Sequence, residues 1–331
     1  MRAPKFWESN GLIPFLLKPL SYGWQAADCL RHLTAKPYQA PMPVLCIGNV
    51  VAGGAGKTPV ALDLLQRLHR RGIAAWALTR GYGGRQSGPL LLDRRHHTAM
   101  DVGDEALLLA EIAPTLVARN RPDGARLAAA HSAPALVLDD GLQNPSLVKN
   151  LSLLVIDGAY GIGNGQIMPA GPLRESLSSA IGRCHAAVII GDDRHGIVSL
   201  LPKTKTILRG RFIPDNAASF SGQRVLAFAG IGRPKKVAAS LREAGADVIA
   251  LRAFPDHHPY TPAEMARLIA DAAAAKARLV TTAKDYVRLP AEFRDQISVF
   301  RIKLAWDNPQ EIENILDSFL AKGSKLKQTE K

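Results

Sequence analysis

Apolar runs and amphipathic stretches alternate along the chain from residue 43 onward. PVLCIGN (43–49) and PALVLDD (134–140) have the length and composition of buried strands, whereas the apolar positions of KTPVALDLLQRLHRRG (57–72) recur at helical spacing. This order of strand and helix is repeated several times. Because strands that alternate with helices are joined by right-handed crossovers, we expect an α/β fold with a doubly wound, mostly parallel sheet.

The same pattern continues toward the C-terminus. Residues 198–222 are less regular and are interpreted as a β linker, after which the series restarts. A helix over 261–277 begins with a capping box, because Thr261 is followed three residues later by Glu264. The other predicted strands are 73–80, 114–119, 151–158, 185–193, 223–232, 246–254, 278–285 and 297–304, and the other predicted helices are 105–113, 123–131, 173–182, 235–244 and 308–321.

The glycine-rich segment GNVVAGGAGKTPV (48–60) lies between the first predicted strand and helix. Its end matches a P-loop, G-x-x-x-x-G-K-[ST], but that spacing requires glycine at position 51, which is Val51. A P-loop binds phosphate through the N–H groups of the turn and the positive end of the following helix. We expect Lys57 to reach the β- and γ-phosphates and Thr58 to bind Mg²⁺. The candidate ATP-binding residues are Val51, Ala52, Gly53, Gly54, Ala55, Gly56, Lys57 and Thr58.

P-loop enzymes also need a strand that ends in an aspartate near the metal. Asp139 and Asp140 follow four apolar residues, at the carboxyl end of a predicted strand, where ligands of parallel sheets gather. We therefore expect them to hold Mg²⁺, together with Thr58. The predicted organisation is an arm (1–40), a P-loop core (41–200) and a second, smaller α/β lobe that completes the site (201–331).

Other nucleotide and metal motifs are incomplete. GIGRPKK (230–236) lacks the third glycine of a dinucleotide-binding turn, and TAKD (282–285) places lysine and aspartate side by side, unlike a guanine-reading loop. DHH (256–258) has no accompanying cluster of metal ligands. The three cysteines are far apart, which disfavours a disulfide framework or a zinc site.

The charge balance favours an anionic partner. Lys and Arg number 42 against 29 Asp and Glu, for a formal net charge of +13. No segment interleaves basic and aromatic residues as proteins that bind single-stranded nucleic acid do, so we expect no nucleic-acid partner.

The N-terminal GLIPFLLKPLSYGW (11–24) is apolar but is interrupted by proline and lysine, so we do not expect it to span a bilayer. Its aromatic and basic residues are typical of a membrane-interfacial segment, or of an arm packed on its own domain.

Seven motifs, in order across residues 43–290, resemble the tetraacyldisaccharide 4'-kinase family of the lipid A pathway. They are GN-x-x-x-GG-x-GKTP (48–59), TRGYGG (79–84), VGDEALLLA (102–110), LDDGLQN (138–144), GNGQIMPAGPLRES (163–176), FPDHHPYT (254–261) and TTAKDYVRL (281–289). In this family the leading glycine of the loop corresponds to Gly48, so Val51 is compatible with phosphate binding. Val51 and Ala55 differ from the hydroxyl and small polar residues often found there.

The resemblance implies ATP-dependent phosphorylation of the 4'-hydroxyl of an acylated glucosamine disaccharide 1-phosphate, with Mg²⁺, giving the bis-phosphorylated lipid A precursor. It also implies a peripheral or monotopic enzyme whose partner is the lipid surface at the cytoplasmic face of the bacterial inner membrane, and it favours membrane contact by the arm.

The resemblance also suggests roles for individual residues. From the residues alone, Asp104 and Glu105 could be acidic residues that favour a helix N-terminus or a general base. By motif position Asp104 is the general base and His257 its partner, a role that His258 could also fill. The further candidate site residues are Glu105, Gln143, Arg121 and Arg174.

Three alternative functions have different sequence requirements. A P-loop GTPase or metal-insertion chaperone would need a guanine-reading motif, and a nucleic-acid ATPase would need helicase-like repeats or a stacking platform. A non-catalytic membrane scaffold would have no need of Lys57 and the strand-end aspartates together.

Overall fold

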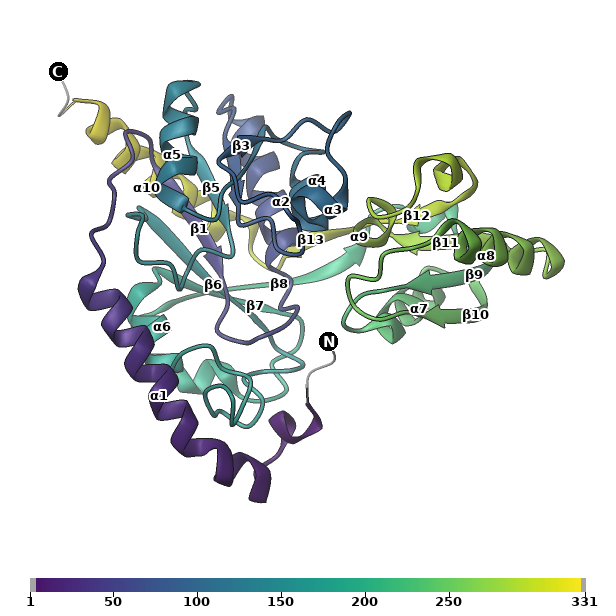
Figure 1. Cartoon of the computed structure of the whole chain (residues 1–331), viewed down its shortest axis with the longest axis horizontal. Helices are drawn as coiled ribbons and strands as arrows, with labels where there is room; N and C mark the ends of the chain where they lie inside the picture. The colour runs from purple at the N-terminus through teal and green to yellow at the C-terminus, as the bar shows by residue number, and fades with distance from the viewer. Residues whose placement is uncertain (1–3, 329–331) are drawn as a thin grey trace.

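The protein is built around two β-sheets, which lie side by side in Figure 1. The structure, a computed structural model, describes residues 4–328. The larger sheet has nine strands in the order β13-β8-β7-β6-β1-β5-β2-β4-β3. They are β1 (Val44–Gly48), β2 (Trp76–Thr79), β3 (Leu90–Leu91), β4 (Thr115–Val117), β5 (Leu136–Asp139), β6 (Leu151–Asp157), β7 (Ala186–Ile190), β8 (Thr206–Pro214) and β13 (Ile302–Trp306). Only the outermost pairs, β3 with β4 and β13 with β8, are antiparallel.

Helices cover both faces of this sheet, as a doubly wound fold requires. On one face, α2 (Lys57–Arg70) and α10 (Pro309–Gln328) pack their apolar sides against β1, β6 and β7. On the other face lie α5 (Arg121–Ala130) and α6 (Leu177–Arg183). Two short helices, α3 (Ala99–Val102) and α4 (Asp104–Leu109), precede β4, and the 3₁₀ helix η2 (Ile197–Leu200) follows β7. The predicted α/β class and mostly parallel sheet are confirmed.

The smaller sheet has four parallel strands in the order β10-β9-β11-β12. Its strands are β9 (Arg224–Ala229), β10 (Asp247–Ala253), β11 (Arg278–Thr282) and β12 (Ser298–Phe300). Its helices are α7 (Pro234–Glu243), α8 (Pro262–Ala274) and the single turn α9 (Ala283–Tyr286), with the 3₁₀ segments η3 (Ala217–Ser219) and η4 (Ala291–Gln296). The predicted capping box at Thr261 and Glu264 is confirmed.

Two sequence interpretations of the chain between the sheets were wrong. Within the segment taken as an irregular linker, β8 is a regular nine-residue strand of the larger sheet. The single strand predicted over 297–304 is two strands in different sheets, β12 and β13, which are separated at Arg301. Asn216 fixes the chain where it passes from β12 to β13, since its side chain donates to the Val299 carbonyl (2.8 Å) and accepts from the Arg301 N–H (3.0 Å). The two sheets therefore do not divide at residue 201, because β8, β13 and α10 belong with the larger one.

The N-terminal arm is a short 3₁₀ helix, η1 (Lys5–Glu8), followed by α1 (Leu12–Thr34), which runs along the outside of the larger lobe in Figure 1. Pro19 lies inside α1, so proline does not break the segment as the sequence suggested. Ser21 is the anchor on its inner side: its hydroxyl is buried and donates to the Ile167 carbonyl at 2.7 Å. Within residues 4–328, no helix is both long and apolar enough to cross a membrane.

Candidate active site

The glycine loop joins the end of β1 to the first residue of α2, as predicted. Gly56 precedes the helix in the left-handed region (φ 84°), which glycine adopts without strain. At the start of the loop, a Cβ on Gly48 would lie 2.3 Å from the Leu142 Cβ. Gly48 is thus required because the loop after β5 packs directly against the end of β1.

Asn49, which the sequence analysis did not single out, organises this loop. Its fully buried amide donates to the carbonyls of Val51 (2.7 Å) and Gly53 (3.4 Å), and its Oδ1 accepts from the Lys57 Nζ (3.1 Å). Val51 is buried and forms an isolated antiparallel bridge with Leu173. Valine at position 51 therefore fixes the loop by packing.

Lys57 and Thr58 each contact one of the strand-end aspartates. The Thr58 hydroxyl donates to the Asp139 Oδ2 (2.9 Å), and the Lys57 Nζ lies 3.6 Å from the Asp140 Oδ2. Asp140 is also held by the Arg174 guanidinium, 2.9 Å from both of its oxygens. The predicted residues of the loop and of the strand end are thus brought together at the carboxyl edge of the sheet.

The two neighbouring aspartates are in different electrostatic environments. Complete burial, with the charge of nearby Glu105, raises the pKa of Asp139 to about 7. For Asp140, burial acts in the same direction but is outweighed by the charges of Lys57 and Arg174, which hold its pKa below the ordinary value. Asp139 Oδ1 is buried and has no hydrogen-bond partner among the described residues. This oxygen is therefore available to a ligand.

Asp104 and His257 form a hydrogen-bonded pair, although they are 153 residues apart. The His257 Nδ1 lies 2.8 Å from the Asp104 Oδ2, and the Asp104 side chain is only 2% exposed. Burial alone would raise the pKa of Asp104. The hydrogen bond to His257 and the charges of Lys284, His257 and Arg288 outweigh burial and lower its pKa instead. Asp104 Oδ1 is buried without a partner among the described residues, so it is free to accept a proton.

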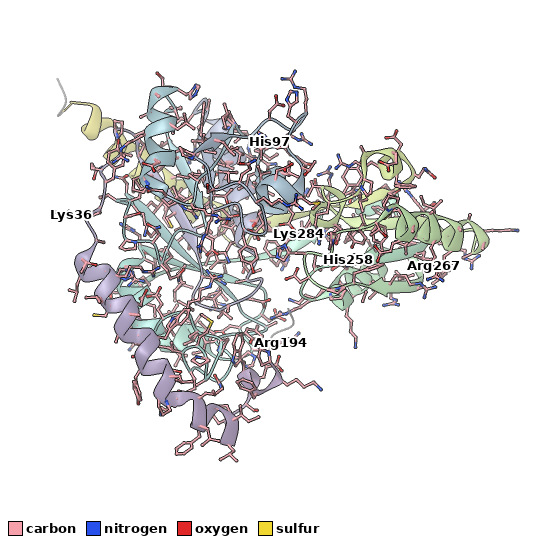
Figure 2. The ribbon with its side chains drawn as sticks, viewed as in Figure 1. Lys36, His97, Arg194, His258, Arg267 and Lys284 are labelled. Carbon is pink, nitrogen blue, oxygen red and sulfur yellow. The ribbon has the colours of Figure 1, made fainter. Side chains whose placement is uncertain are left out.

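This pair lies where the two lobes meet, since Asp104 begins α4 of the larger lobe and His257 belongs to the smaller lobe. Lys284, on α9, lies 3.4 Å from the His257 Nε2 and 3.8 Å from the Glu105 Oε1. Figure 2 shows Lys284 at the junction, with His258 farther into the smaller lobe. His258 instead binds Glu264 (3.0 Å), so His257 is the histidine paired with Asp104.

Of the remaining predicted residues, Gln143 contacts the loop, whereas Arg121 contacts the chain just after β4 and β5. The Gln143 amide donates to the Asn49 carbonyl (2.7 Å) and to Glu175 (3.0 Å). Arg121 is buried, which lowers its pKa to about 10 despite the opposing charge of Asp140, and it donates to the Ala118 carbonyl (2.5 Å).

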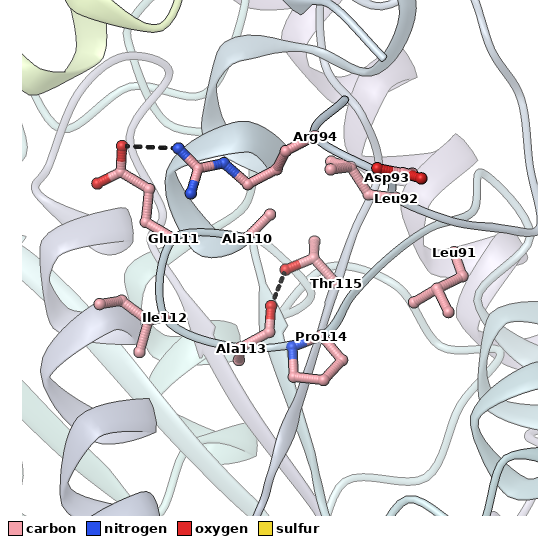
Figure 3. A pocket seen from close by; sticks show the side chains of 10 residues that line it. All are labelled: Leu91, Leu92, Asp93, Arg94, Ala110, Glu111, Ile112, Ala113, Pro114 and Thr115. Carbon is pink, nitrogen blue, oxygen red and sulfur yellow. Dashed lines mark hydrogen bonds and ion pairs between the residues drawn. The ribbon is translucent and has the colours of Figure 1, made fainter. Parts of the chain in front are cut away.

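A surface hollow elsewhere on the larger lobe is not a candidate for this chemistry. It lies around the chain that enters β4, where the Thr115 hydroxyl donates to the Ala113 carbonyl (2.9 Å) and Arg94 pairs with Glu111 (3.6 Å) (Figure 3). It is thus at the amino end of a parallel strand, whereas ligands of such sheets bind at the carboxyl ends. None of the predicted site residues lines it.

The fold and the loop define a P-loop nucleotide-binding protein, in which a second lobe supplies the histidine that pairs with Asp104 of the larger lobe. The model of the family described as tetraacyldisaccharide-1-P 4'-kinase, LpxK, matches residues 13–321, and the chain belongs to this family of kinases. The predicted family is confirmed.

Individual relatives agree over nearly the whole chain. The tetraacyldisaccharide 4'-kinase of Rhodospirillum centenum is 51% identical over 328 residues, covering 97% of each chain. That of Paramagnetospirillum magneticum is 47% identical, covering 96% of this chain and 98% of the relative. These relatives give no support to a GTPase or a metal-insertion chaperone.

A solved structure shares the fold. The crystal structure of the "apo" form of LpxK from Aquifex aeolicus, in complex with ATP, has a TM-score of 0.76 and covers 93% of this chain and 99% of its own. Its sequence identity is 23%.

Proposed function

We propose that this kinase transfers the γ-phosphoryl group of ATP to the 4'-hydroxyl of a tetraacyldisaccharide 1-phosphate, with Asp104 as the general base. Family membership supports the reaction, and the buried Asp104–His257 pair beside the phosphate loop is the observation that supports the mechanism. Lipid A precursor synthesis is the process to which this reaction belongs.

The phosphate loop positions the donor. The N–H groups from Gly53 to Gly56 and the N-terminus of α2 face the phosphates, and Lys57 neutralises charge on the transferring group. Because Asn49 and Asp140 already hold the lysine ammonium near the loop, it needs little reorganisation when ATP binds. Such preorganised charge accounts for much of the rate enhancement in phosphoryl transfer.

Asp104 receives the proton of the acceptor hydroxyl. Its lowered pKa keeps the carboxylate ionised near neutrality, and Oδ1, which has no partner in the described part of the chain, is the atom that takes the proton. His257 holds Oδ2 and so fixes the direction in which Oδ1 points. As the hydroxyl oxygen forms its bond to the γ-phosphorus, the bond to the β–γ bridging oxygen breaks and ADP leaves.

Mg²⁺ fits the residues at the end of β5. Asp139 has a buried oxygen without a partner among the described residues, and burial together with the charge of Glu105 raises its pKa, so that a bound cation would stabilise its ionised form. We assign Thr58 and Asp139 to hold the ion, and Asp140, already paired with Arg174, to a supporting position. Few protein ligands are needed, because Mg²⁺ bound to a nucleotide is held mainly by phosphate and water. The ion would neutralise charge on the β- and γ-phosphates.

We also propose that the enzyme acts as a peripheral or monotopic protein at the cytoplasmic face of the bacterial inner membrane, where the acyl chains of its acceptor would lie. The exposed side of α1 supports this proposal, because it carries large apolar side chains that no described residue covers, among them Leu12 (73% exposed), Phe15 (71%) and Leu33 (79%). Exposed apolar surface beside lysines is typical of helices that lie in the interface of an anionic bilayer.

The inner side of α1 is packed on the larger lobe next to the site. The Trp24 indole donates to the Arg174 carbonyl (2.8 Å), and Arg31 donates to the Gln143 carbonyl (2.9 Å). Packing and membrane contact, the two interpretations that the sequence left open, are therefore compatible, since they use opposite sides of one helix. Deleting the arm would disturb the site as well as the membrane surface, so substitutions on the exposed side give the cleaner test.

The activity is tested with purified protein, ATP, Mg²⁺ and tetraacyldisaccharide 1-phosphate, scored for a new phosphate on the lipid. The proposal predicts phosphorylation at the 4' position. An acceptor whose 4'-hydroxyl is blocked should not be phosphorylated. ATP hydrolysis without a phosphorylated lipid product would contradict the proposal.

A further inference from the structure

Arg288, just after α9 in the smaller lobe, is a buried cation that the mechanism above does not use. Its side chain is 5% exposed. Nη2 donates to the Asp285 Oδ1 (2.7 Å) and the Gly230 carbonyl (2.9 Å), and Nη1 donates to the His258 carbonyl (3.2 Å). Nε donates to the Lys284 carbonyl (3.1 Å) and lies within ion-pair distance, 3.4 Å, of the Asp104 Oδ2, the oxygen that also binds His257. One guanidinium thus contacts the catalytic carboxylate and the segment that carries its histidine partner.

The buried guanidinium of Arg288 already has a counter-ion within its own lobe, the Asp285 carboxylate. Asp285 is completely buried, and it also accepts from the Gly230 N–H (2.7 Å) and the Tyr260 hydroxyl (2.7 Å). This network fixes the guanidinium on the smaller lobe before Asp104 is considered. The contact with Asp104 is therefore an additional one, made between the lobes.

We propose that Arg288 is a positioning residue for phosphoryl transfer: it docks the Asp104 carboxylate of the larger lobe against the His257–His258 segment of the smaller lobe. The inference rests on the proposed role of Asp104 as general base. The planar guanidinium suits this task because its donors point in fixed directions toward separate acceptors, which a lysine ammonium cannot reproduce. With Oδ2 hydrogen-bonded to His257 and ion-paired with Arg288, Oδ1 is directed toward the acceptor hydroxyl.

The charged groups around Asp104 determine how removal of Arg288 would change the pKa of Asp104 and so the pH–rate profile. The cationic or titratable groups facing it are His257, Lys284 on α9 and Arg288, while Glu105 follows it on α4. Asp256 lies 3.8 Å from the His257 Nε2. Since Arg288 stabilises the ionised form of Asp104, its removal raises the pKa of the base. The acid limb of the pH–rate profile should then move to higher pH, which loss of packing alone would not cause.

Arg294 provides a matched control in the same lobe. Like Arg288, it binds backbone carbonyls, those of Leu289 (3.0 Å) and Val287 (3.2 Å), and it lies over a tyrosine ring, that of Tyr286 (5.8 Å). The structure records no contact between Arg294 and Asp104 within the described residues. Substitution of Arg294 therefore reports the loss of an arginine's backbone hydrogen bonds and ring contact in this lobe, whereas Arg288→Lys, which keeps a cation beside Asp285, controls for the loss of that ion pair.

The experiment compares Arg288→Met, Arg288→Lys and Arg294→Met in the full chain, with ATP, Mg²⁺ and the tetraacyldisaccharide 1-phosphate. We expect Arg288→Met to lower kcat about 100-fold, as a misplaced catalytic group does, with KM for ATP changed less than about twofold. Its acid limb should move up by about one pH unit. Arg288→Lys should keep the limb near the wild-type position, because the charge remains, but should still lower kcat about tenfold. Arg294→Met should resemble the wild type.

The outcomes separate this inference from the proposed function. If Arg288→Met does not fold, Arg288→Lys decides, because it retains a cation for Asp285. The inference is overturned if Arg288→Lys matches Arg294→Met in kcat, or if a folded Arg288→Met lowers kcat without moving the acid limb. Asp104→Asn is run in parallel, since full activity in that variant would remove the proposed general base itself, whatever Arg288 does.

Discussion

Replacing Asp139 by asparagine should stabilise the metal-free protein while it removes the kinase activity. Asp139 is 1% exposed, and its Oδ1 has no partner among the described residues. Burial and the charge of Glu105 raise its pKa from 3.8 to about 7. A buried carboxyl with a raised pKa destabilises the fold at every pH at which the unfolded chain would ionise it. Asparagine has the same shape and carries no charge, so it removes this cost.

The size of the effect follows from the shift in pKa. Roughly three units correspond to about 4 kcal/mol at about pH 8, where Asp139 is ionised in both the folded and unfolded states. Near pH 5 the folded protein keeps Asp139 protonated, and the cost falls to roughly 1–2 kcal/mol. The asparagine oxygen can still accept from Thr58, but a buried amide donor without a partner costs about 1–3 kcal/mol. We therefore expect a net stabilisation of about 1–3 kcal/mol near pH 8 and little or none near pH 5.

Urea unfolding of the wild type and Asp139→Asn in the presence of a chelator, at both pH values, measures this difference. Comparing the two proteins at each pH cancels the titration of groups that do not interact with Asp139. An Asp139→Asn protein that is less stable than the wild type at both pH values, or a difference that does not change with pH, would refute the reasoning. Adding Mg²⁺ and ATP should stabilise the wild type more than the variant, because binding to the folded state alone raises its stability.

Three further predictions concern the loop, the strand end and the arm. Lys57→Ala should lower turnover by about 100-fold or more with the fold retained, as circular dichroism and a phosphate-transfer assay would show; near-normal turnover would contradict the loop assignment. Asp140→Asn should impair Mg²⁺-dependent turnover less than Asp139→Asn does, and a metal titration of kcat compares them. Phe15→Ser, on the exposed side of α1, should weaken binding to anionic vesicles, measured by co-sedimentation, whereas Leu200→Ser, at an exposed site outside the arm, should not; equal binding by both variants would place the membrane surface elsewhere.

The phosphate loop was predictable because its determinants are local. A strand, a glycine-rich turn and a helix follow one another within 48–60, and the strand-end Asp139 is marked by the apolar run before it. The contacts of Thr58 with Asp139 and of Lys57 with Asp140 agree with the prediction that the loop and the strand end lie close together. The structural role of Asn49 was also predictable in principle, because a polar residue at the end of a buried strand needs hydrogen-bond partners.

The junction between the lobes was not predictable in this way. Asp104 and His257 are far apart in sequence, and only the family resemblance paired them. The pattern of 297–304 predicts β structure but does not show that Arg301 separates strands of two sheets. Arg288 lies between Val287 and Leu289, and its contacts are with Asp285, the Tyr260 ring and Asp104 of the larger lobe, two of which are distant in the sequence. Local sequence determines each element, whereas tertiary packing determines which side chains meet.

The most direct test of the mechanism is the turnover of Asp104→Asn, measured as transfer of labelled γ-phosphate to the tetraacyldisaccharide 1-phosphate at saturating ATP and Mg²⁺. Asparagine preserves the shape of the side chain but cannot take the proton from the hydroxyl. The mechanism predicts that kcat falls by about 100-fold to 10,000-fold, while the dissociation constant for ATP stays close to that of the wild type. An Asp104→Asn enzyme that turns over within about threefold of the wild-type rate would show that Asp104 is not the general base.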